Sequence, residues 1–191
     1  GTIKLDGNYP VGTDNVALGN TALDSITSGG DYNVAIGSKA LTANTSGVTN
    51  SALGVQALET NTTGSNNTSI GGSSLRYNTT GVSNTAMGRD ALRANTTASN
   101  NTAVGYQAGY SVTTGINITL MGSGAGDSVT TGNSSAAFGY GALASVTTND
   151  NNTAIGTLSM QNSTGANNTA VGYTSLRAAG SGSNNVAVGY E

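Results

Sequence analysis

The chain has 191 residues and a formal net charge of −3, with 8% charged residues, 29 glycines, one Phe, one Pro and no His, Cys or Trp. Without His and Cys it lacks Ser/His/Asp and Cys/His nucleophiles, zinc or iron–sulfur sites held by these residues, and disulfide frameworks. We therefore expect a non-enzymatic protein with no catalytic residues, no metal and no cofactor.

The charge pattern and the apolar pattern exclude two kinds of partner. The six basic residues are scattered, so there is no concentrated basic face for nucleic acid. Apolar runs are only a few residues long, far below the roughly 20 that span a bilayer, so we expect no membrane insertion. Because the chain begins at Gly1 and stops within a repeat, we expect it to be cut from a longer protein.

Two regions follow in chain order. Residues 1–14 form a lead-in segment, and residues 15–191 form about eleven repeats of the motif N-x-A-Φ-G, where Φ is apolar and the last repeat is truncated. The motif glycines recur every 16 to 18 residues, most often every 17, at Gly19, Gly37, Gly54, Gly71, Gly88, Gly105, Gly122, Gly139, Gly156, Gly172 and Gly189. Each repeat reads as a short strand, a glycine bend, a second apolar segment and a polar turn.

We number each repeat from its Asn, so the glycine takes position 5. Position 3 is nearly always Ala, and the alternation of a strand puts it on the face opposite to positions 2 and 4. We expect the Ala face to point outward. Position 4 is always a sizeable apolar residue, and we expect its members to form the structural core: Leu18, Ile36, Leu53, Ile70, Met87, Val104, Met121, Phe138, Ile155, Val171 and Val188.

Position 9 supplies a second apolar column, mostly Leu, which is interrupted by Gly109 and Gly126. Between residues 15 and 190, charges occur only at positions 6, 7, 10, 16 and 17, which separates the inside from the outside of a coil. A 17-residue period is too short for helix-pair repeats or propeller blades. The sequence therefore predicts an all-β parallel solenoid (β-roll) of 17-residue coils.

Segments 33–40, 101–108 and 185–190 (NVAIGSKA, NTAVGYQA and NVAVGY) resemble the head repeats of trimeric autotransporter adhesins. They are still more similar to the N-T-A-V-G-Y-Q-A-L-type repeats of phage tail fibres, and residues 1–10 resemble a lead-in segment of such fibres. The resemblance implies a left-handed roll, three chains side by side, and a location in a virion tail fibre. The alternatives are a bacterial adhesin head, at the cell surface, and a self-assembling extracellular filament.

The chain's partners are accordingly expected to be itself, as a homotrimer, and a host cell-surface glycan or protein receptor. The uncharged Ala face of position 3 suits a close contact between chains. We expect a rigid spacer that presents or binds a receptor, and a wall without a singular concave pocket, since the coil repeats with little variation. The position of the Thr residues argues against an ice-binding array.

Three sets of side chains are candidates for binding. Tyrosines recur at position 6 and could stack on sugar rings, or they could shield the glycine bend, which we favour: Tyr106, Tyr140, Tyr173 and Tyr190. The position-12 residues Asn44, Asn61, Asn78 and Asn95 predict a stacked amide ladder rather than a ligand site. At position 10, Glu59, Arg76 and Arg93 predict a surface ion pair, with an acidic-sugar site as the alternative.

Overall fold

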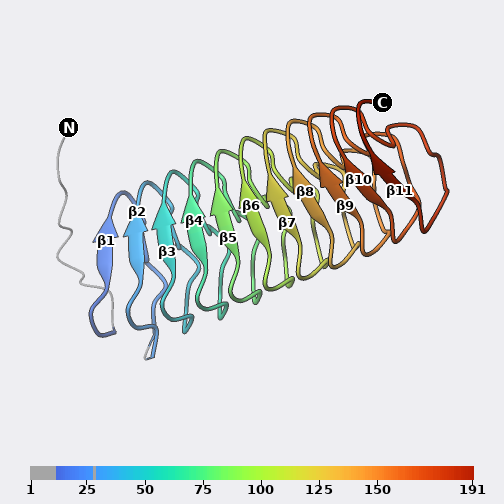
Figure 1. Cartoon of the computed structure of the whole chain (residues 1–191). Coiled ribbons are helices and arrows are strands. Elements are labelled where there is room, and N and C mark those ends of the chain that lie inside the picture. The colour runs from blue at the N-terminus through green and yellow to red at the C-terminus, as the bar shows by residue number, and fades with distance from the viewer. Residues whose placement is uncertain (1–11, 28) are drawn as a thin grey trace.

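The computed structural model describes residues 12–27 and 29–191, which form a parallel β-solenoid without a helix. Figure 1 shows the strands side by side along one wall of a rod, with β1 at one end and β11 at the other. The predicted fold class is confirmed. The eleven strands pair in chain order in one sheet and are β1 Val16–Leu18, β2 Val34–Ile36, β3 Ser51–Leu53, β4 Thr68–Ile70, β5 Thr85–Met87, β6 Thr102–Val104, β7 Thr119–Met121, β8 Ala136–Phe138, β9 Thr153–Ile155, β10 Thr169–Val171 and β11 Val186–Val188.

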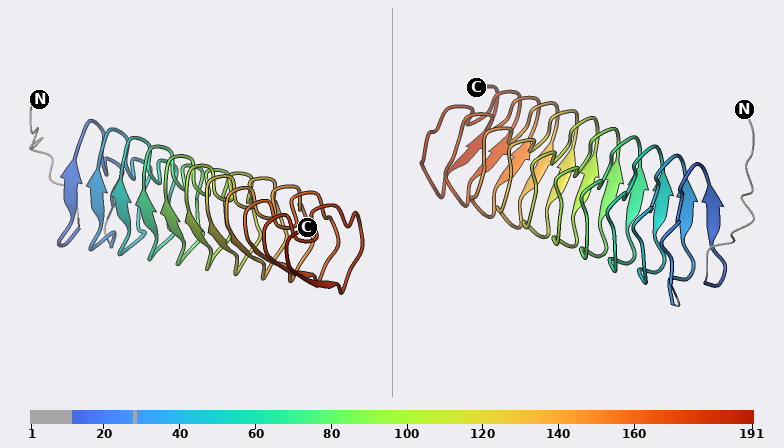
Figure 2. Two further views of the ribbon diagram at one scale, coloured as in Figure 1. Left: turned by 45° about the horizontal axis from the view of Figure 1, so that its top comes forward. Right: turned by 180° about the vertical axis from the view of Figure 1, so that it is seen from behind.

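The strands occupy positions 2 to 4 of each repeat, and equivalent positions lie beside one another. Ala35 of β2 pairs with Ala52 of β3, for example. The other walls of the coil, visible in the two views of Figure 2, are also joined by backbone hydrogen bonds, such as the amide of Leu41 donating to the carbonyl of Ala57 at 3.0 Å. Ten steps of about 4.8 Å make the sheet roughly 48 Å long.

The glycine at position 5 is required by the closeness of successive coils. Gly71 has a φ of 127°, and a Cβ placed on it would lie 2.7 Å from the carbonyl carbon and oxygen of Gly88 in the next coil. Both the backbone conformation and this contact exclude side chains. The motif glycine therefore marks the corner where the chain leaves the strand.

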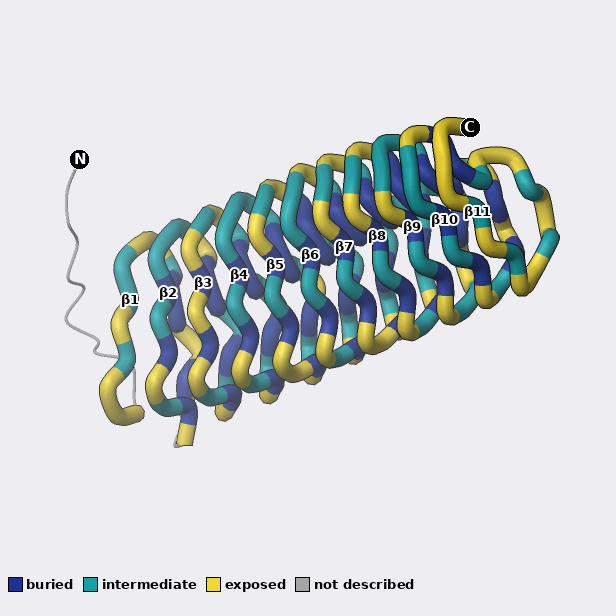
Figure 3. Tube along the Cα trace, in the orientation of Figure 1, coloured by how far each residue is buried: buried dark blue, intermediate teal, exposed yellow. Residues whose placement is uncertain are grey.

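The interior of the solenoid is narrow and is filled by small residues packed against one column of Leu. Ala86 at position 3, Ala91 at position 8 and Leu92 at position 9 all have an exposed fraction of 0%. Figure 3 shows buried residues recurring at the same places in successive coils. The position-9 column is thus buried, as the pattern predicts.

The predicted orientation of the strands is wrong, because position 3 points inward and position 4 points outward. A coil of this width has room for Ala beside the Leu column, and larger side chains must therefore lie on the outer face of the sheet. The residues predicted as structural core are half-buried or exposed: Leu18, Ile36, Leu53, Ile70, Met87, Val104, Met121, Phe138, Ile155, Val171 and Val188. The predicted outward Ala column is the buried one.

A Leu in place of Ala at position 3 of one strand shows how tightly the interior is filled. Position 3 of β7 carries Leu120 instead of Ala, and the two flanking position-9 residues are Gly109 and Gly126. A Cβ on either glycine would lie 2.8 Å or less from a δ-carbon of Leu120. Leu120 therefore occupies the volume that two missing Leu side chains would fill, while Val112 and Val129 at position 12 are also buried.

Two columns of buried Asn side chains form hydrogen bonds with backbone and side-chain groups of neighbouring coils. At position 12, the amide nitrogens of Asn61 and Asn78 donate to the side-chain oxygens of Asn44 and Asn61 at 2.8 and 2.7 Å, which confirms the predicted amide ladder. At position 1, the oxygen of Asn50 accepts a hydrogen bond from the backbone amide of Asn67 at 3.0 Å. These bonds compensate for burying polar groups.

Residues 1–11 of the predicted lead-in segment 1–14 lie outside the described part of the chain. The strands of the predicted repeat region begin at Val16 and end at Val188.

Candidate ligand-binding surfaces

The four predicted tyrosines at position 6 are all exposed, directly after the glycine corner. Tyr173 and Tyr190 lie in adjacent coils, and their rings stack with centroids 5.2 Å apart and planes 20° apart. Tyr106 and Tyr140 lie two coils apart, with the exposed Ser123 at position 6 of the coil between them. Tyr173 and Tyr190 stack directly on each other, and we call them the closed pair. Tyr106 and Tyr140 have no aromatic ring at position 6 of the coil between them, and we call them the open pair.

The open pair borders a hollow of about 250 Å³ in the wall formed by positions 6, 7 and 10. We call this hollow the notch. It is lined by Tyr106, Gln107, Ser123, Gly124, Asp127, Tyr140, Gly141, Ala144, Leu158 and Gln161. The expectation of a wall without a concave site is therefore wrong at this place.

The notch exists because small residues meet in consecutive coils. Position 7 is Gly124 in one coil and Gly141 in the next, whereas the coils before and after carry Gln107 and Leu158. A Cβ on Gly124 would meet no atom within 4 Å, so the space in front of it is open. The missing side chain of Gly124 and the short Ser123 at position 6 make the depression, while Leu158 reaches over Gly141, where a Cβ would lie 2.8 Å from its Cδ2.

Asp127 at position 10 supplies the charged group of the notch. It is half-buried, and burial raises the pKa of its carboxyl above the ordinary value. Its Oδ1 accepts a long hydrogen bond, 3.4 Å, from the hydroxyl of Ser128, and local backbone amides of Asp127 and Ser128 also bond to the carboxyl. Within the described part of the chain, no Lys or Arg forms an ion pair with it. The carboxylate therefore retains capacity to accept further hydrogen bonds.

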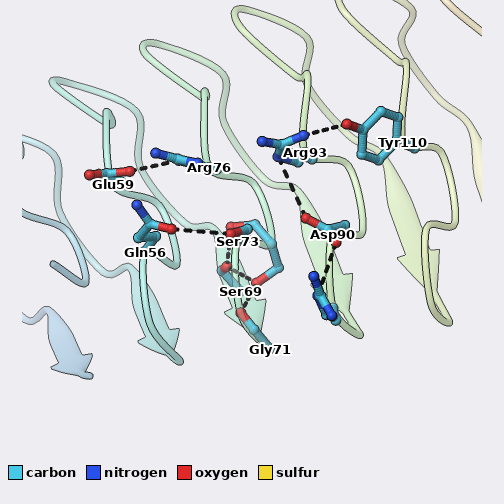
Figure 4. A network of polar contacts seen from close by, with 11 residues as sticks. Gln56, Glu59, Ser69, Gly71, Ser73, Arg76, Asp90, Arg93 and Tyr110 are labelled. Carbon is cyan, nitrogen blue, oxygen red and sulfur yellow. Dashed lines mark hydrogen bonds and ion pairs between the residues drawn. The ribbon is translucent and has the colours of Figure 1, made fainter. Parts of the chain in front are cut away.

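The charged column at position 10 lies nearer the N-terminal end, and its side chains bond to one another and to neighbouring side chains of the wall (Figure 4). Arg76 Nε donates to Glu59 at 2.7 Å, and Arg93 bonds to the hydroxyl of Tyr110 and lies 3.5 Å from Asp90. The two guanidinium groups also lie 5.1 and 5.4 Å from the ring centroid of Tyr77. The geometry favours the predicted ion-pair interpretation over an acidic-sugar site.

A larger hollow, of about 440 Å³, lies at the last coil. Its lining includes Leu176, Ala179 and Ala187, which stand at positions 9, 12 and 3, so it is the uncovered end of the interior. Thr174, Arg177 and Glu191 also line it, but because it is the open end of the stack and not a hollow in the wall, we do not treat it as a ligand site.

The outer face of the sheet is a second candidate surface, for contact between chains. We use the name outer face for the side chains at positions 2 and 4 of β1 to β11. Large apolar side chains on it are strongly exposed, including Leu53 at 48%, Met87 at 41% and Phe138 at 38%. No strand residue is charged. The face therefore carries an uninterrupted apolar column at position 4 beside a position-2 column that is mostly Thr.

Two other kinds of site are absent from residues 12–27 and 29–191. Nowhere in these ranges do three or more His, Cys, Asp or Glu side chains gather closely enough to bind a metal ion. The same ranges contain no helix with the length and apolar character needed to cross a membrane.

Sequence reasoning found the tyrosines but missed their neighbours in the notch, namely Ser123, Gly124, Asp127 and Gln161. The signal is present in the repeat columns, where two consecutive glycines at position 7 stand between Gln107 and Leu158. It becomes visible only when four coils are compared at three positions together. No family model matches this chain, and no curated protein or solved structure is significantly similar to it.

Proposed function

We propose that this chain is a structural segment of a homotrimeric attachment fibre, which serves as a rigid spacer and presents or binds a receptor. The proposed location is a phage tail fibre, with the surface of a bacterium as the alternative. The proposal assigns no enzymatic activity to the chain. It rests on the shape of the solenoid, the outer face and the resemblance of the repeats to fibre proteins.

The observation that carries the proposal is the exposure of the outer face. Parallel sheets in proteins are normally covered on both sides, and here the inner side is covered by the solenoid's own interior. The outer side leaves residues such as Leu53 and Met121, exposed by 48% and 41%, in contact with water. An apolar strip of this length marks a contact surface.

The most suitable cover is another copy of the chain. A partner must match a strip of roughly 48 Å with a side-chain period set by the strand spacing of about 4.8 Å, and an identical solenoid has this length and period. Uncharged strands place no like charges against each other when copies meet. The proposal of three copies comes from the resemblance of the repeats to those of trimeric fibre proteins.

The regular backbone hydrogen bonds between coils support the role of spacer. Each coil is bonded to its neighbours on several walls, for example through Leu41 and Ala57 at 3.0 Å and through Thr45 and Thr62 at 2.9 Å. A stack of units that rely on their neighbours resists bending and local opening. Three such stacks side by side make a stiffer rod than one.

The mass of the protein in solution tests the proposal. Size-exclusion chromatography with light scattering should give about three times the 18.7 kDa of one chain, independent of concentration in the micromolar range. A stable monomer would contradict the proposed fibre. Masses that grow without limit as the concentration rises would instead favour the self-assembling filament.

A further inference from the structure

We propose that the notch binds one ring of an uncharged sugar, held between Tyr106 and Tyr140 and hydrogen-bonded by Asp127 and Gln161. The proposal rests on the proposed function in one respect, since it names the class of receptor that the fibre would recognise. The site itself is argued from the single chain.

The spacing of Tyr106 and Tyr140 leaves room for one further ring between them. Rings at position 6 of adjacent coils stack at 5.2 Å, as Tyr173 and Tyr190 show. Tyr106 and Tyr140 are separated by two coils, or roughly 10 Å on the strand spacing. A ring inserted midway would lie about 5 Å from each tyrosine ring, the distance at which such rings stack. The open pair thus leaves one ring position vacant.

The polar groups of the notch can form hydrogen bonds with a ligand. Asp127 offers carboxylate oxygens whose protein partners are all local, a 3.4 Å bond from the Ser128 hydroxyl and the backbone of Asp127 and Ser128, and no ion pair with any Lys or Arg of the described residues. The Oε1 of Gln161 already accepts from Arg177 at 3.1 Å, which leaves its NH₂ group free to donate. Ser123 and Gln107 add a hydroxyl and an amide. An acceptor and several donors around an aromatic slot suit a ring that carries hydroxyl groups.

The volume and the charge of the notch further restrict which ligands fit it. The notch measures about 250 Å³, below the roughly 300–1,000 Å³ of sites for drug-sized ligands, so it takes one ring and not a longer chain. No Lys or Arg lines it, and its only ionisable carboxyl is Asp127. A sialic acid, a sulfated sugar or a phosphate would be repelled. A quaternary ammonium group would fit between the rings but would leave Ser123, Gln107 and Gln161 unused.

The notch stays accessible when the outer face is covered. Its residues stand at positions 6, 7 and 10, and the same wall carries charged side chains that are open to water. The side chain of Arg89 at position 6 is 75% exposed, and that of Lys39 at position 7 is 52% exposed. Chain contacts through positions 2 and 4 therefore leave this wall facing outward.

The decisive variant is Gly124→Gln, which fills the notch with a side chain that the fold already accepts at position 7. Gln107 stands there in the preceding coil at a φ of 55°, close to the 66° of Gly124. The matched control is Ser73→Gln, the same residue at the same position, φ 58°, in a coil outside the notch. Tyr140→Ser and its control Tyr32→Ser, an exposed tyrosine elsewhere, remove a ring in place of adding a side chain.

Binding is measured by saturation-transfer NMR with glucose, galactose, mannose, N-acetylglucosamine, N-acetylneuraminic acid and choline as separate probes. At least one of the four neutral sugars should bind in the millimolar range, and Gly124→Gln and Tyr140→Ser should each weaken that binding by about tenfold or more. Ser73→Gln and Tyr32→Ser should leave it unchanged. Thermal melting of each variant confirms that it is folded.

Three results would overturn the proposal: no binding of any neutral sugar, sugar binding that survives Gly124→Gln, or preferential binding of choline or N-acetylneuraminic acid at the notch. Light scattering on the same samples keeps this test separate from that of the fibre. A trimer that binds no sugar removes the site and leaves the fibre. A monomer whose sugar binding is lost in Gly124→Gln removes the fibre and leaves the site.

Discussion

At the scale of single residues, the solenoid is governed by how closely its coils approach. Gly71 and Gly72 are neighbours in the chain, yet they differ completely in this respect. Gly71 has a φ of 127° and faces the backbone of Gly88 at 2.7 Å, whereas the nearest atom to a Cβ on Gly72 would lie 3.9 Å away. Position 5 therefore demands glycine for two reasons, and position 6 does not demand it at all.

Gly71→Ala should destabilise the protein by about 3 kcal/mol or more, because it adds backbone strain and a clash with Gly88. Gly72→Ala should be neutral or stabilising by up to about 1 kcal/mol, since alanine restricts the unfolded chain. Chemical denaturation of both variants at one protein concentration measures the difference. Equal effects would contradict the stacked glycine corner.

At the scale of the repeated element, the position-12 Asn ladder ends where the sequence changes. Asn78 both donates to Asn61 and accepts from Asn95, each at 2.7 Å. Asn95 is the last member, because the next coil has Val112 at this position, and its side-chain oxygen has no hydrogen-bond partner. Interior and terminal members of one ladder can thus be compared directly.

Replacing an interior member should therefore cost more than replacing the last one. Asn78→Val leaves both Asn61 and Asn95 short of a partner, and we expect a loss of about 3 kcal/mol. Asn95→Val leaves only Asn78 short and brings a valine against Val112, so we expect about half of that loss. Denaturation curves for the two variants and wild type provide the measurement. A larger loss for Asn95→Val would mean that the ladder does not contribute as a chain of bonds.

The repeat columns contain most of the fold but not the orientation of the strand. The 17-residue period, the motif glycines and the segregation of charges predict a parallel solenoid, and the amide ladder follows from stacked Asn. Each strand, however, is apolar on both faces, so alternation alone does not distinguish inside from outside. Column variation does: the inner column is nearly always Ala, while the outer column ranges from Val to Phe because it is not confined by packing.

The notch was harder to predict for a related reason. A column describes one position over all coils, and the notch depends on three positions over four coils. Tyr106 and Tyr140 are ordinary members of their column, and Gly124 is only one more glycine in a chain that has 29. Their effect arises from the spatial register of the coils, which brings Asp127 and Gln161 to the same place.

At the scale of the whole molecule, one side of the sheet is covered and the other is open. The inner side packs Ala86 against the Leu column with no exposure, while its neighbour Met87 on the outer side is 41% exposed. A single chain satisfies the first surface by folding. The second surface stays exposed in a single chain and would be covered by the proposed association, so folding and assembly should be separable by substitution at two adjacent residues.

We therefore expect Ala86→Asp and Met87→Asp to fail in different ways. Ala86→Asp puts an unpaired carboxylate in the interior and should lower the melting temperature by about 10 °C or more, whatever the state of association. Met87→Asp lets its carboxylate reach water in the single chain but would bury it between copies, so we expect a folded monomer. Circular dichroism reports the fold and light scattering reports the mass, with Met87→Leu as the control that should still associate. An unchanged mass for Met87→Asp would exclude the outer face as the contact between chains, and a harmless Ala86→Asp would contradict the inward orientation of position 3.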